Sequence, residues 1–178
     1  MRPRFIAGAS LGSMIALAML LASCGYGVGG RASRLPPGIK VIAVPSLVNK
    51  TNRYRIEQRL TEALVRELLS RTKYRVVANP EAADAVLRGE IDAIEASSIV
   101  FDPTTGRTTT MLVTVTTRVR LEDRETHKVL YRNDKFVFRQ PYETSTDIAS
   151  FFQEEGPAMD RLAHDFASRL VADVLENF

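Results

Sequence analysis

The sequence predicts an α+β fold, a two-layer sandwich in which two long helices pack on one face of a mostly antiparallel, mixed β-sheet of about four to five strands. Apolar and polar residues alternate from Thr110 to Leu121, which is typical of a half-buried antiparallel strand. Two other segments, one on each side of the strand-rich middle, carry apolar residues at three- and four-residue spacing. Such amphipathic helices bury their apolar stripes most simply by covering one face of the sheet.

The first strand is predicted over residues 39 to 44, after the breaker Pro36-Pro37-Gly38 and before Pro45. The first helix is predicted over residues 54 to 70, with Asn49, Thr51 and Asn52 as candidate N-caps. Its charged side chains, from Arg53 to Glu67, mostly occupy the solvent face. Its apolar stripe consists of Ile56, Leu60, Ala63, Leu64 and Leu68.

Short strands are predicted over residues 74 to 77 and 85 to 94, with Gly89 marking a bulge or a close approach of two segments. The turn residues from Asp102 to Arg107 predict a hairpin into the alternating strand. That strand places Met111, Val113, Val115, Val119 and Leu121 on one face and Thr110, Thr114, Thr116, Arg118 and Arg120 on the other. After a charged turn, its partner strand is predicted over residues 129 to 132 and 136 to 138.

A helical period returns near the C-terminus, first over Ile148–Phe152 and then, after Gly156-Pro157, over a longer run. One stripe of this second run collects Met159, Leu162, Ala163, Phe166, Leu170 and Val174. Such a stripe is typical of a core-facing helix and not of a cofactor site.

The N-terminus has the pattern of a secretory signal. Arg2 and Arg4 precede an uncharged segment whose apolar core runs from Met14 to Ala22, which is short against the about 20 residues of a membrane span. The residues Leu21-Ala22-Ser23-Cys24 resemble the lipobox of bacterial lipoproteins, which implies cleavage before Cys24 and acylation of that cysteine. We therefore expect a signal peptide over residues 1–23, a lipidated flexible tether over 24–38 and a single domain over 39–178.

Other interpretations of this stretch are weaker. Gly25, Gly27 and Gly30 have the spacing of a dinucleotide-binding loop, but the segment is not flanked by a strand and a helix. A catalytic thiol at Cys24 needs a neighbouring base, and the two histidines, His127 and His164, lie far along the chain. The glycines fit a flexible tether better.

Charge and motif content argue against nucleic-acid binding and catalysis. Without Arg2 and Arg4, the 24 basic residues become 22 against 21 acidic ones, so the basic balance nearly disappears. The sequence after Cys24 carries no spacing typical of a metal, haem, nucleotide or nucleophile site. We expect no cofactor and no enzymatic activity.

The mature chain resembles the lipopolysaccharide-assembly lipoprotein family LptE. The resemblance rests on Cys24-Gly25-Tyr26, on Val41–Val44 leading to Asn49 and the amphipathic helix, on Ala83–Gly89, on the alternating strand from Met111, and on the terminal helix from Ala158. It implies an outer-membrane lipoprotein, anchored on the periplasmic side, that plugs the lumen of the LptD-like β-barrel translocon. It also implies that the protein assists assembly of that barrel and contacts lipopolysaccharide. Gly25, where inner-membrane lipoproteins commonly carry Asp, agrees with the outer membrane.

Arginines are the candidate lipopolysaccharide contacts, since guanidinium groups bind phosphates in a bidentate manner. Arg107 is the nearest match to a basic residue that the family associates with glycolipid contact. Arg118 and Arg120 lie on the polar face of the alternating strand, and Arg132 and Arg139 lie on its partner strand.

A second group of lipoproteins shares part of the pattern. The segment from Val41 to Val77 is similar to the start of periplasmic lipoproteins that activate penicillin-binding proteins or form curli-type secretion complexes. These lipoproteins share the anchor and differ in partner. They continue with a further strand and helix, whereas this chain continues with a long antiparallel pair.

Overall fold

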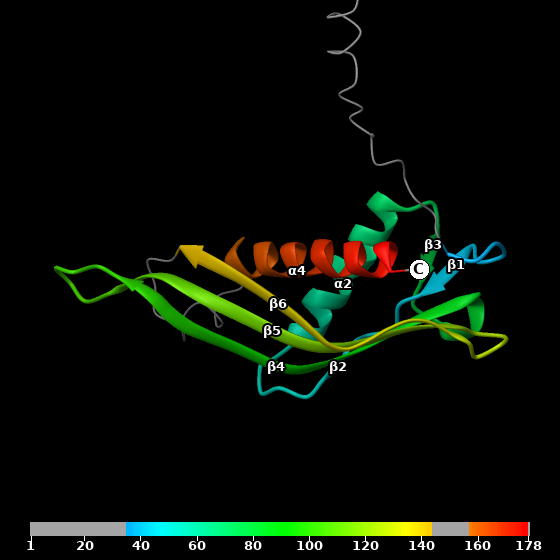
Figure 1. Ribbon diagram of the computed structural model, residues 1–178, viewed down its shortest axis with the longest axis horizontal. Helices are drawn as coiled ribbons and strands as arrows, with labels where there is room; N and C mark the ends of the chain where they lie inside the picture. The colour runs from blue at the N-terminus through cyan, green and yellow to red at the C-terminus, as the bar shows by residue number, and fades with distance from the viewer. Residues whose placement is uncertain (1–34, 144–156, 178) are drawn as a thin grey trace, which may run out of the picture. The chain divides into compact units, whose positions relative to one another are not determined.

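A computed structural model describes residues 35–143 and 157–177 (Figure 1). The signal peptide, Cys24, most of the tether and the segment Ile148–Phe152 lie outside these residues. The described elements, in chain order, are β1 (Val41–Ala43), β2 (Val48–Asn49), α2 (Ile56–Arg71), β3 (Arg75–Val77), the 3-10 helix η1 (Pro80–Ala82), β4 (Ala85–Phe101), β5 (Thr108–Asp123), β6 (Val129–Glu143) and α4 (Pro157–Glu176).

The strands form one mixed sheet of order β3-β1-β4-β5-β6, with β2 also pairing with β4. The short strands β1, β2 and β3 pair in parallel, whereas β4, β5 and β6 form an antiparallel meander. Strand β4 is longer than its predicted range of 85 to 94, because its apolar alternation fades while pairing with β5 continues to Phe101. Strand β6 runs unbroken from Val129, with a register irregularity opposite Arg118.

Both described helices lie on the same face of the meander, and α2 crosses α4 (Figure 1). The predicted stripes of both helices are buried, as are the predicted inward positions of β5. The α+β two-layer fold predicted from the sequence is therefore confirmed. Leu35 and Ile39, which precede β1, are buried in the same core.

Aromatic side chains hold α4 on the edge strand β6. The ring of Phe166 meets Phe136 and Phe138 edge-on, at centroid distances of 5.9 and 6.0 Å, a geometry that aromatic pairs prefer. On either side of this cluster, a tyrosine of β6 donates a hydrogen bond to a carboxylate of α4: Tyr131 to Asp173, and Tyr142 to Asp165. Burial raises the pKa of both phenols, and the carboxylates add to the shift, so both hydroxyls stay protonated as donors.

Gly89 marks a close approach, as its place in the strand predicts. A Cβ atom there would lie 2.6 Å from Cδ2 of Leu47, a buried residue of the segment between β1 and β2, which both pair with β4. The register irregularities of β4 lie further along, the first between Ile91 and Ala93 and two more between Ser98 and Phe101.

Two local predictions for α2 are wrong. The N-cap is Arg55, in a left-handed conformation and without a side-chain cap, whereas Asn49 and Thr51 bond within the preceding loop. Glu67 is not on the solvent face: it is 6% exposed and pairs with Arg71 at 2.5 Å. A buried carboxylate at this position is tolerated because the guanidinium one turn later compensates its charge.

The hydroxyl of Thr117 lies in the core without a hydrogen-bond partner among the described residues. Burying an unpaired hydroxyl is costly, and valine has the same shape without it. We expect Thr117→Val to raise the free energy of unfolding by about 1–2 kcal/mol. Chemical denaturation of both proteins measures this difference.

Thr116→Val is the matched control, since Thr116 is half-buried on the opposite face of β5. This change should alter stability by less than about 0.5 kcal/mol. A loss of stability in Thr117→Val would show that the hydroxyl is bonded in the folded protein.

Candidate functional site

The face of the β4–β6 meander that points away from the helices carries two of the predicted site residues, Arg118 and Arg120. Arg118 and Arg120 are exposed there, and Thr110, Thr114 and Thr116 are half-buried. Arg139 of β6 lies opposite Thr114 and has no ion pair with any described residue. We call this surface the outer sheet face.

Arg118 lies at the centre of an ion-pair network. Its Nε and one terminal nitrogen bond both oxygens of Asp92, at 2.9 and 2.6 Å, and the same terminal nitrogen lies 2.7 Å from Glu90. Lys50, which follows β2, reaches Glu90 at 2.6 Å. The short strand β2 is thereby tied to the outer sheet face, and much of the hydrogen-bonding capacity of Arg118 is already used.

The pKa values of this network follow from these contacts. The hydrogen bond from Arg118 lowers the pKa of Asp92, and the hydrogen bond from Lys50 is the main cause of the lowered pKa of Glu90. The pKa of Arg118 is raised in return, chiefly by its bond to Asp92. Asp92, Glu90 and Arg118 therefore stay charged near neutral pH.

Three further arginines lie side by side across the strands of the meander. Arg88 is the register partner of Arg120, and Arg120 is the register partner of Arg132. Arg120 pairs with Glu122 at 3.0 Å and Arg132 with Asp134 at 2.8 Å, whereas Arg88 has no ion pair with a described residue. Arg88 was not among the predicted contacts, because only the pairing register of β4 with β5 places it beside Arg120.

Arg107 lies far from this group, in the hairpin between β4 and β5. The carboxylate of Asp102 accepts hydrogen bonds from the backbone N–H groups of Thr104 and Thr105, at 2.8 and 2.7 Å, which lowers its pKa. Gly106 has φ +64°, which a glycine tolerates without strain. Arg107 is exposed and has no ion pair with a described residue.

The hairpin also exposes apolar side chains. Ile99, Val100 and Phe101 are 48%, 49% and 56% exposed, and they precede the turn directly. Because side chains of consecutive strand residues point to opposite faces, the hairpin exposes apolar groups on both of its sides.

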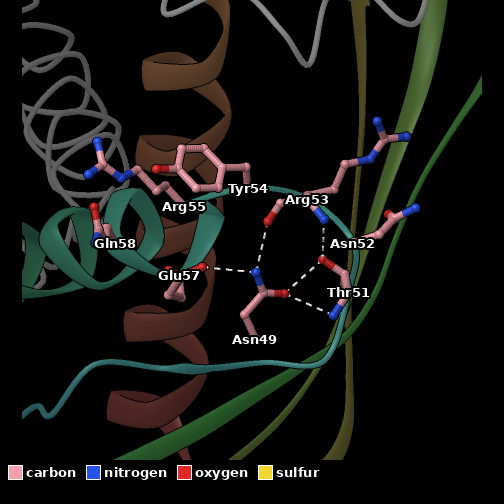
Figure 2. Close-up of a pocket in the computed structure, with 8 residues that line it drawn as sticks. All are labelled: Asn49, Thr51, Asn52, Arg53, Tyr54, Arg55, Glu57 and Gln58. Atoms are coloured by element: carbon pink, nitrogen blue, oxygen red, sulfur yellow. Dashed lines mark hydrogen bonds between the residues drawn. The ribbon is translucent and has the colours of Figure 1, made fainter.

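The loop before α2 forms an open pocket, shown in Figure 2. The Asn49 side chain donates to the backbone oxygen of Arg53 and to Glu57, and it accepts from the backbone and the hydroxyl of Thr51. The loop presents Tyr54, which is 84% exposed, with the guanidinium of Arg55 5.2 Å from the ring centroid. This loop is ordered by its own hydrogen bonds and displays an aromatic ring beside a cation.

The described residues include no group of three or more side chains that could hold a metal ion. His164 lies 3.9 Å from Glu67, at the crossing of the two helices and away from the outer sheet face. In the described part of the chain, no helix is both long and apolar enough to cross a membrane.

The chain matches the family model LptE, described as lipopolysaccharide-assembly, over residues 39–174. Among the described elements, the match includes α2, the meander and most of α4, together with every predicted arginine contact. No curated protein matches the sequence.

Solved structures with a similar fold share little sequence with the chain. The hypothetical protein CT253 from Chlamydia trachomatis is 14% identical, with a TM-score of 0.52, over 77% of this chain and 96% of that one. Protein XCC0632 from Xanthomonas campestris is 15% identical, with a TM-score of 0.52, over 76% and 84%. The uncharacterized lipoprotein B from Nitrosomonas europaea is 16% identical over 85% and 88%, with a TM-score of 0.48. The likeness to the first two shows the fold alone.

Proposed function

The chain belongs to the lipopolysaccharide-assembly family LptE, and we propose that it acts there as the lipid-anchored partner of an LptD-like β-barrel that translocates lipopolysaccharide. It would plug the barrel, assist its assembly and help to deliver lipopolysaccharide to the outer leaflet. We propose no catalytic step for it, since the role is to bind and position.

The outer sheet face is the observation that supports this partnership. Its charges are largely compensated within the face, as in the pairs Arg118–Asp92, Lys50–Glu90 and Arg120–Glu122. A barrel lumen is polar and wet, so a surface of paired charges and threonines can lie against it at little desolvation cost. An apolar surface would suit a dry protein interface better.

The anchor is proposed from the N-terminal sequence. Residues 1–23 are the proposed signal peptide, Cys24 the acylated residue, 24–38 the tether and 39–178 the domain on the periplasmic side of the outer membrane. Several acyl chains on Cys24 would hold the protein firmly, because each buried CH₂ contributes about 0.8 kcal/mol and a single chain anchors only weakly.

Arg107, Arg118 and Arg120 remain the proposed lipopolysaccharide contacts. Arg107 differs from the other two because its side chain is not engaged by a carboxylate of the described residues. A phosphate at Arg118 would compete with Asp92 and Glu90. We therefore propose the hairpin, with its exposed Ile99–Phe101 segment beside Arg107, as the main glycolipid contact.

Copurification tests the partner. The full chain, extracted from native membranes in mild detergent, should bring down a large outer-membrane β-barrel. Recovery of a peptidoglycan synthase without a barrel would contradict the proposal and support the second group of lipoproteins.

Acylation is tested at Cys24. Labelling of cells with a fatty-acid probe should mark the wild-type protein, and Cys24→Ala should lose the label completely, because the chain has no other cysteine. A Cys24→Ala protein that still carries the label would refute the assignment.

Glycolipid contact is tested at Arg107. Arg107→Glu replaces a free cation by an anion, so affinity for lipopolysaccharide should fall by about three- to tenfold in a direct binding assay. Arg75→Glu is the control, since Arg75 is an exposed strand arginine on β3, outside the proposed contacts. Equal affinities for wild type and Arg107→Glu would remove this residue from the contacts.

A further inference from the structure

Three arginines occupy one row of the outer sheet face. Arg88, Arg120 and Arg132 are consecutive register partners on β4, β5 and β6, and neighbouring strands lie only about 4.8 Å apart. Like charges directly opposite each other destabilise a sheet. An anion that binds between the three guanidinium groups therefore reduces their mutual repulsion.

The existing carboxylates compensate this row only in part. Arg120 contacts Glu122 through its Nε, and Arg132 contacts both oxygens of Asp134 through its Nε. Neither bond uses the terminal nitrogens of the two guanidinium groups, and Arg88 has no carboxylate partner among the described residues. The Glu122 and Asp134 contacts hold two of the three side chains while leaving their forked ends available.

A hollow lies at this row. It has a volume of about 190 Å³, and its lining includes the three arginines, Arg118, Glu90 and Asp134. With Asp92 and Glu122 beside the hollow, four guanidinium groups meet four carboxylates, but two of these carboxylates are held by Arg118, and Arg88 has none among the described residues. Arg118 contributes little to binding because Asp92 and Glu90 already hold it.

We propose that Arg88, Arg120 and Arg132 bind a phosphate group in this hollow. Phosphate offers several oxygens to converging guanidinium forks, whereas a carboxylate offers only two. The hollow is separate from the hairpin: 13 residues of β4, Gly89 to Phe101, lie between Arg88 and Asp102, roughly 45 Å along an extended strand. The proposal therefore stands independently of the glycolipid contact proposed at Arg107.

The test is a titration of the detergent-solubilised full chain with inorganic phosphate at constant ionic strength, followed by NMR of the arginine Nε–Hε signals. The signals of Arg88, Arg120 and Arg132 should shift together and saturate. Arg88→Gln should weaken binding by at least about fivefold, and Arg88→Lys should weaken it as well because the fork is lost. Arg75→Gln, a strand arginine whose register partner is Val41, should leave it unchanged.

A gain of affinity provides a second test that misfolding cannot imitate. Glu122→Gln and Asp134→Asn each remove a negative charge from the row, so phosphate should bind about two- to fivefold more tightly to either variant. Unchanged or weaker binding in both variants would overturn the proposal. So would an equal response of the three signals to glutamate, since the row would then be a general positive surface.

Lipid ligands identify the source of the phosphate. If lipid A micelles bind in a manner that requires Arg88, and dephosphorylated lipid A does not, the group belongs to a glycolipid headgroup. If inorganic phosphate alone depends on Arg88, the site serves a free anion. Arg107→Glu should leave the inorganic phosphate titration unchanged, which separates this site from the hairpin. Binding of phosphate and lipid A that is independent of Arg88 would exclude the row as a site.

Discussion

Burial of the apolar face of the meander is the constraint on which the rest of the structure depends. Strands β4, β5 and β6 are too apolar on one side to face water, and α4 covers that side through Phe166, Phe136 and Phe138. Burying each of these rings contributes about 2–3 kcal/mol. The tyrosine–carboxylate bonds of β6 to α4 then set the position of the helix, because each joins a buried hydroxyl of the strand to a carboxylate of the helix.

The covering helix is shorter than the strands beneath it. A helix of 20 residues, such as α4, spans roughly 30 Å, whereas the 17 residues of β4 span roughly 55 Å. The mismatch coincides with the change in β4 from buried residues near Ala85 to the half-exposed Ile99, Val100 and Phe101. The accessible apolar hairpin thus follows from the relative lengths of helix and strand, and it places Arg107 at the far end of the sheet.

The arginines of the meander and its β4–β5 hairpin are of two kinds: those held by carboxylates and those without a carboxylate partner among the described residues. Arg118 is held by two carboxylates and ties β4, β5 and, through Glu90 and Lys50, the β2 segment together. Arg88 and Arg107 have no carboxylate partner among the described residues, so they can meet an anion without first breaking an ion pair. The phosphate contacts that we propose lie at such groups, and a polar face of compensated charge suits the wet barrel lumen of the proposed partner.

The sequence by itself determined the fold class, because periods of two and of three to four residues report directly which side of each element is apolar. It also indicated the family, the hairpin at Asp102–Arg107 and the close approach at Gly89.

Tertiary structure alone decided which charged side chains meet. The pairing of Arg118 with Asp92 and the row of Arg88, Arg120 and Arg132 depend on the register between strands. The burial of Glu67 depends on how α2 lies against its surroundings, and the Arg55 cap on how the Asn49 loop folds. Alternation along one strand carries no information about register, since many alignments of two alternating strands bury the same apolar face.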